Sequence, residues 1–96
     1  MESFEKEIKD LVGWEKVENK LSKNFKFKDF IESFSFITRI AIISEKMNHH
    51  PDITISYNNV HIDLTTHDIN SISKNDIILA RKIEELIWID NSFNTI

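Results

Sequence analysis

The sequence predicts an α+β domain in which an antiparallel four-stranded sheet carries helices packed on one face, in the order α-β-β-α-β-β-α. Two observations favour this architecture. Stretches with apolar residues at every third or fourth position alternate with stretches that have them at every second position. One glycine and one proline among 96 residues leave no evident linker, so we expect one folding unit over residues 1–96.

The first elements should be a short helix and two strands. Residues 2–11 place apolar side chains at helical spacing, and Gly13 follows them as the residue type that often lies just past a helix. The apolar residues then recur at every second position. This change predicts strands at about 14–19 and 21–28.

A long helix is predicted from Asp29, which can cap the first turn, to about Lys46. Its apolar residues form two adjacent stripes, so either other helices flank it on the sheet or a second subunit covers part of it. The stripes consist of Phe30, Phe34, Ile37 and Ala41 and of Phe36, Ile40, Ile43 and Met47. Pro51 disfavours helical geometry at the preceding residue, so the helix should end near Asn48 or His49.

A β-hairpin should follow this proline. Apolar and polar residues alternate over residues 53–57 and again over residues 60–65. Between them, Asn58-Asn59 is the predicted turn, because asparagine tolerates the positive φ that a two-residue turn requires.

A final helix is predicted from Ser73 and Asp76, whose spacing is typical of a helix N-cap followed by an acidic first turn. Trp88 should lie near its end, and no regular structure is expected from Asp90 onward. The inward residues would be Ile77, Ala80, Ile83 and Ile87.

Composition restricts the classes of function. The chain has no cysteine, which excludes disulfides, thiolate zinc sites and cysteine nucleophiles and favours a reducing compartment. The first ten residues are rich in charge, unlike a signal peptide, and no stretch approaches the ~20 apolar residues of a membrane span. We therefore expect a soluble cytoplasmic protein with no membrane partner.

The charge pattern argues against direct nucleic-acid binding. Residues 1–48 carry nine basic and nine acidic side chains, whereas residues 49–96 carry three basic and seven acidic ones. A nucleic-acid binder normally presents a basic face that neutralises phosphates. The nearest candidate is a lysine series that alternates with Phe25 and Phe27, and we interpret it as the solvent face of a strand. The series is Lys20, Lys23, Lys26 and Lys28.

Three of the four histidines flank the predicted hairpin. His49 and His50 precede its first strand and His67 follows its second, so a hairpin with a short turn should bring them together. Glu45 from the end of the long helix and Asp76 from the start of the last helix should join them. The expected cluster therefore contains three imidazoles and two carboxylates.

Such a cluster suits general acid/base chemistry, because imidazole titrates near neutrality and neighbouring carboxylates can orient it. Spacing alone leaves three interpretations open: catalysis, a metal site, and incidental surface or capping histidines. His61 is set apart as structural, since it alternates onto the solvent face of its strand. Tyr57 is either a core residue or one whose hydroxyl reaches a polar rim.

The spacing of these residues resembles the signature of the pterin-4a-carbinolamine dehydratase family. The similarity extends over about residues 11–88, the expected core of the domain. The signature comprises Glu45, His49-His50-Pro51, Tyr57, His67 and Asp76, separated by three, five, nine and eight residues. The surroundings are also similar, at Trp14, Phe25-Lys26-Phe27, Phe30, Val60 and Thr66-His67.

This resemblance implies a dehydratase that converts a 4a-hydroxytetrahydropterin, such as 4a-hydroxytetrahydrobiopterin, into the quinonoid dihydropterin and water. The reaction would recycle the pterin after aromatic amino-acid hydroxylation, and it implies no metal or organic cofactor. His49 and His67 look like the proton-transfer pair, and His50 like the residue that holds the pterin and assists. The positions expected to bind or support the substrate are Glu45, Pro51, Tyr57 and Asp76.

Two of these supporting positions have expected roles. Glu45 would orient a histidine or bind the hydrogen-bonding edge of the pterin, and Asp76 would support the pocket through hydrogen bonds.

Two departures from the family pattern are visible. Ser71-Ile72-Ser73 replaces a common Gly-Leu-Thr or Gly-Leu-Ser, so the loop must turn without glycine. Asn75 replaces an arginine that some members have, which removes a positive charge near the pocket.

The expected partners are a small pterin substrate, further copies of the chain and, as a candidate, an aromatic amino-acid hydroxylase. The apolar arc of the helix at 29–46 and the free strand edges favour a homo-oligomer, either a dimer or a tetramer. The alternative function, from another class, is a non-catalytic binding or transcriptional-coactivator-like protein on the same fold.

Overall fold

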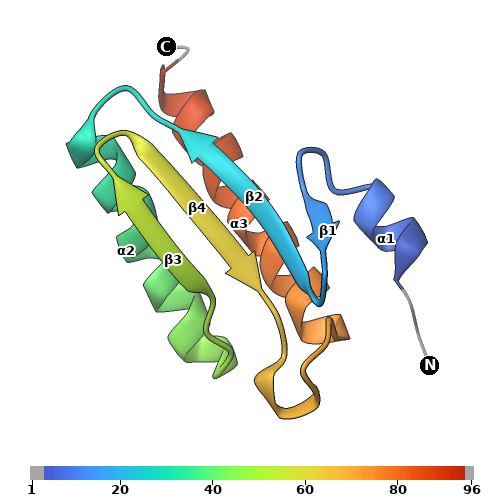
Figure 1. The fold of residues 1–96 in the computed structure, drawn as a ribbon. Coiled ribbons are helices and arrows are strands. Elements are labelled where there is room, and N and C mark those ends of the chain that lie inside the picture. The colour runs from blue at the N-terminus through green and yellow to red at the C-terminus, as the bar shows by residue number, and fades with distance from the viewer. Residues whose placement is uncertain (1–3, 95–96) are drawn as a thin grey trace.

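The fold is a four-stranded antiparallel sheet with two long helices on one face, described by a computed structural model over residues 4–94, with side chains through residue 87 (Figure 1). This confirms the α+β class and the predicted order of elements. The helices are α1 (Glu5–Lys9), α2 (Phe30–Met47) and α3 (Lys74–Asn94). The strands are β1 (Glu15–Val17), β2 (Lys20–Lys26), β3 (Asp52–Ser56) and β4 (Asn59–Leu64). A short 3₁₀ turn, η1 (His67–Ile69), follows β4.

The strands lie in the order β1-β2-β4-β3, and each neighbouring pair is antiparallel. Helices α2 and α3 lie side by side behind the sheet, whereas α1 lies beside the edge formed by β1 (Figure 1). None of the helices in the described part of the chain combines the length and the apolar character needed to cross a bilayer.

The core forms between the sheet and these two helices, because alternate strand residues point toward them. Leu21 of β2 pairs with Leu64 of β4, and Phe25 with Val60, so that large apolar side chains are adjacent on the covered face. Among the side chains that the structure describes, the fully buried apolar residues on the helices are Phe36, Ile40, Leu79, Ala80 and Ile83. On the opposite face, β2, β3 and β4 carry polar side chains such as Asn24, His61 and Thr54, as the period-two pattern predicted.

Helix α2 begins and ends where the sequence predicts, and its end positions two of the histidines. Asp29 caps the helix, since its side chain accepts a hydrogen bond from the Glu32 backbone N–H at 2.8 Å. Asn48 ends it in the left-handed conformation, with φ of 52°. His49 and His50 therefore lie in the extended connection that leads to β3.

Only one of the two predicted stripes on α2 is buried. Phe36 and Ile40 are fully covered, whereas Phe30, Phe34 and Ala41 of the other stripe are exposed. Neighbouring helices within the chain therefore do not cover the whole apolar arc.

Several boundaries differ from the prediction. Helix α1 ends at Lys9, because the chain turns before Gly13, which adopts φ of +86°. Strand β2 ends at Lys26, since the chain must turn toward the cap of α2. The hairpin turn consists of Tyr57-Asn58, one residue earlier than predicted, because Ser56 pairs with Asn59.

Two further predictions were wrong. Regular structure continues past Asp90, since α3 extends to Asn94 through a stretch without glycine or proline. The side chain of Trp88, predicted near the end of this helix, lies outside the side chains that the structure describes. Lys23 does not lie on the solvent face. Its ammonium group donates hydrogen bonds to Glu84 of α3 and to the Val12 carbonyl, in the connection before β1.

Candidate active site

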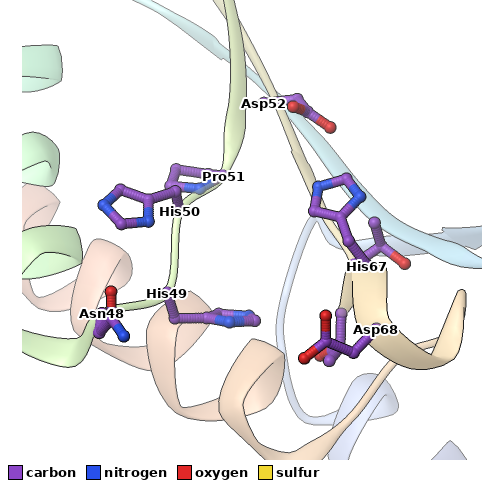
Figure 2. Close-up of a pocket in the computed structure, with 9 residues that line it drawn as sticks. Asn48, His49, His50, Pro51, Asp52, His67 and Asp68 are labelled. Atoms are coloured by element: carbon purple, nitrogen blue, oxygen red, sulfur yellow. The ribbon is translucent and has the colours of Figure 1, made fainter.

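A pocket of about 280 Å³ lies where the segment before β3 meets the segment after β4 (Figure 2). It is lined by two runs of the chain, residues 48–52 and 65–68. Antiparallel pairing of β3 with β4 aligns Asp52 with Asp63, so the start of one strand lies beside the end of the other. The hairpin thereby brings His49, His50 and His67 to one pocket, as the sequence predicts.

His49 is held by a buried carboxylate. Its Nε2 lies 2.5 Å from Asp76 Oδ1, and the two side chains are 12% and 0% exposed. The other oxygen of Asp76, Oδ2, accepts hydrogen bonds of 2.8 Å from the Ser73 backbone N–H and from the Thr66 hydroxyl. Because an ionised carboxylate can only accept, we assign the Nε2 proton to His49. Nδ1 is then the ring nitrogen that Asp76 does not engage.

The position of Asp76 follows from the way α3 begins. Asp76 is the third residue of the helix, and from this position an acidic side chain reaches back to the N–H of the residue before the helix. The predicted helix start is therefore also the support of His49. Local capping and site geometry depend on the same carboxylate.

His50 also lines the pocket, but its ring is turned away from that of His49 (Figure 2). Its Nε2 lies 2.7 Å from Glu45 Oε1, and the two side chains are 55% and 78% exposed. Glu45 itself does not line the pocket. The geometry favours the first of its two expected roles, the orientation of a histidine.

His67 occupies the opposite wall of the pocket. It begins η1, and its exposed ring lies across the pocket from His49 and Pro51 (Figure 2). The glycine-free loop after it turns at Asn70, which adopts φ of 50°. A backbone bridge between Thr66 and Ser71 then closes the loop. Asn70 therefore supplies the left-handed residue that lets this loop turn without glycine.

Tyr57 lies outside this pocket. It occupies the hairpin turn, at the end of β3 remote from Pro51, and is 63% exposed. It is neither a core residue nor a wall of the site. His61 also lies elsewhere: on the open face of the sheet it contacts Asn24 Oδ1 at 2.7 Å and Asp63 Oδ1 at 3.0 Å. This geometry agrees with a structural role for His61.

Sequence reasoning did not predict the other lining residues as site residues. Asp52 and Asp68 each follow a signature residue directly, and Thr66 precedes His67. That adjacency was the available signal, since a residue next to a site residue often lines the same cavity. The remaining two are Asn48 and Thr65.

The lining is acidic and polar, with neither lysine nor arginine among its members. The residues that the structure describes include no group of three or more histidine, aspartate or glutamate side chains arranged to hold a metal ion. Two imidazoles are instead each directed at one carboxylate. The arrangement suits proton transfer to and from a bound molecule.

Comparison with known proteins identifies the family. The family model described as "Pterin 4 alpha carbinolamine dehydratase" matches residues 1–86. The chain belongs to this family. A relative from Thermomicrobium roseum is 46% identical over 79 residues, which cover 82% of this chain and 85% of the relative. Another, from Prochlorococcus marinus strain SARG, is 50% identical over 78 residues, 81% of each chain. Both are provisionally named pterin-4-alpha-carbinolamine dehydratases.

Two solved structures share the fold. The crystal structure titled transcriptional coactivator/pterin dehydratase, from Brucella melitensis, aligns with a TM-score of 0.83 and 36% identity. The alignment covers 88% of this chain and 95% of that one. A pterin dehydratase-like protein, described as a RuBisCO assembly factor of the alpha-carboxysome, aligns with a TM-score of 0.63 over 76% of this chain and 84% of that one. At 22% identity it shows the fold alone.

Proposed function

We propose that this chain is a 4a-hydroxytetrahydropterin dehydratase that uses histidine general acid/base catalysis. The observation that carries the proposal is the His49–Asp76 pair, which faces His67 across a pocket in a member of the dehydratase family. Loss of water from the substrate requires one group that accepts a ring proton and another that protonates the departing hydroxyl. Two imidazoles on opposite walls can fill these two roles.

In the proposed mechanism His49 is the base. With its Nε2 proton held by Asp76, the free Nδ1 accepts the proton of pterin N5, and the buried carboxylate stabilises the imidazolium that forms. The N5 electron pair then forms the N5–C4a double bond while the C4a–O bond breaks. His67, in its protonated form, donates a proton to the departing hydroxyl, which leaves as water. Water returns the proton from His49 to His67.

Three other residues of the signature would contribute to substrate binding. His50 and Pro51 form the wall beside His49, and Glu45 limits the orientations of the His50 ring. By this proposal the protein acts in the cytoplasm as a homo-oligomer and recycles the pterin of an aromatic amino-acid hydroxylase. Tyr57, at the far end of the hairpin, would take no part in a site made by a single chain.

The proposal predicts that the purified protein accelerates the loss of the 4a-carbinolamine absorbance above the rate in buffer. His49→Ala and His67→Ala should each lower this rate by about 10²- to 10⁴-fold, because each removes one partner of the proton transfer. His61→Ala is the matched control, since His61 lies on the open sheet outside the pocket and should leave the rate unchanged.

The same assay distinguishes the dehydratase from the alternative, a non-catalytic, coactivator-like protein. That alternative is favoured by the double title of the Brucella melitensis structure. If the wild-type protein does not exceed the buffer rate and both histidine variants behave identically to it, the dehydratase proposal is wrong. Activity that is lost on chelation and restored by zinc or iron would instead favour a metal-dependent mechanism.

A further inference from the structure

Thr66 connects the two walls of the pocket. Its hydroxyl donates to Asp76 Oδ2 at 2.8 Å, the carboxylate that holds His49. Its backbone precedes His67 directly, and its N–H donates to the Ser71 carbonyl at 2.9 Å, which closes the loop that carries His67. One residue is therefore bonded to the support of the first histidine and covalently joined to the second.

The directions of the hydrogen bonds around Thr66 can be assigned. A hydroxyl has one proton to donate, and the Asp76 carboxylate cannot donate in return. The Thr66 hydroxyl therefore donates its proton to Asp76, so the Ser73 hydroxyl, 2.5 Å away, must donate to Thr66. All donors in this chain of hydroxyls point toward Asp76, where Nε2–H of His49 arrives from the other side.

We propose that Thr66 is a positioning residue that keeps His49 in its Nε2–H tautomer and fixes its placement opposite His67. Its catalytic consequence rests on the proposed dehydratase function, whereas its effect on the tautomer does not. Without the Thr66 hydroxyl, Oδ2 of the fully buried Asp76 retains only the Ser73 N–H. The carboxylate can then rotate, and the Nε2–H acceptor of His49 is no longer fixed.

The deciding variants are Thr66→Val, which keeps the β-branched shape but removes the hydroxyl, and Thr66→Ser, which keeps the hydroxyl. Nitrogen-15 NMR of the imidazole groups reports the His49 tautomer directly. We expect the Nε2–H form in the wild-type protein and in Thr66→Val a shift toward a mixture of tautomers. Dehydratase kcat should fall by about 10- to 100-fold in Thr66→Val with KM changed less than about 3-fold, because misplacement affects the reacting groups more than binding.

Thr66→Ser should restore both the tautomer and kcat to within about 3-fold of the wild-type values, since it regains the same donor. Ser33→Ala is the control for loss of a buried hydroxyl, because its bond to the Asp29 carbonyl lies at the other end of α2. It should change neither measurement.

Three results would overturn the proposal. One is a wild-type protein in which His49 carries its proton on Nδ1. This measurement does not depend on the folding of any variant. Another is Thr66→Val with wild-type tautomer and kcat. The third is Thr66→Ser impaired as much as Thr66→Val, which would indicate packing rather than the hydroxyl. A tautomer that responds to Thr66→Val in a protein without dehydratase activity would refute the proposed function and leave the positioning role standing.

Discussion

On the open face of the sheet, Asp63 is held in its ionised form by its neighbours. Burial raises its pKa, but hydrogen bonds from Ser22 and His61 and the charges of His61 and Lys20 outweigh this, so the pKa lies below its ordinary value. A carboxylate whose pKa is lower in the folded state stabilises the fold at a pH above the unfolded pKa of about 3.9. That contribution is lost as the pH falls through the folded pKa.

This predicts a pH-dependent cost for Asp63→Asn. The variant should be less stable than the wild type at pH 6, and the difference should shrink as the pH falls from about 4 toward 2, because the wild-type carboxyl becomes protonated. Urea unfolding of both proteins across this range measures the difference. An equal difference at pH 6 and pH 2.5 would contradict the prediction, since a cost that is independent of charge would reflect lost packing.

At the scale of residues, the sequence predicted the meeting of the histidines but not the direction in which each ring points. Proximity of His49 and His67 follows from hairpin topology alone. The turn of His50 toward Glu45 depends on side-chain rotamers, which the spacing of residues does not specify. The hydrogen bond from Thr66 to Asp76 was not predicted for a related reason. It joins two segments whose relative position depends on how α3 packs, which the sequence spacing does not specify.

At the scale of elements, local signals predicted best where they involve a strong steric or capping constraint. Asp29 and Pro51 fix the two ends of the long helix, and both were predicted correctly. The hairpin turn was displaced by one residue because Ser56 pairs with Asn59 and Ile55 with Val60. This register leaves Tyr57 and Asn58 between the strands, and the identity of the turn residues alone did not specify it.

The displaced turn leaves Tyr57 in a left-handed conformation, with φ of 52°. A residue with a β-carbon pays about 1–2 kcal/mol for that conformation. Tyr57→Gly should therefore stabilise the protein, by about 0.5–1 kcal/mol after allowance for the greater freedom of glycine in the unfolded chain. Thermal and urea unfolding measure this change.

The same variant tests whether Tyr57 belongs to the site. Because the turn lies at the end of the hairpin remote from the pocket, Tyr57→Gly should retain the dehydratase kcat and KM. Asn58→Gly is a matched change at the other turn residue. A rise in KM for Tyr57→Gly but not for Asn58→Gly would restore the substrate-binding role that the family resemblance implies.

At the scale of the whole molecule, α2 carries apolar side chains that nothing in the described part of the chain covers. Four of them are each at least 49% exposed: Phe30, Ile31, Phe34 and Ile42. They follow one another along a single helix, over about 18 Å. Exposed apolar side chains gathered along one helix favour association, and a helix of the same sequence from a second copy, packed about a two-fold axis, offers a surface of matching character.

We therefore expect a homo-oligomer whose interface includes α2. Light scattering at micromolar concentration should give at least twice the monomer mass for the wild type, and Phe34→Glu should lower it toward the monomer, because a buried carboxylate without a partner opposes association. Val12→Glu is the matched control, since Val12 is also apolar, is more exposed and lies outside α2. A wild-type protein of monomer mass would refute the expectation. An oligomer that persists in Phe34→Glu would place the interface elsewhere, with the free edge of β3 as the next candidate.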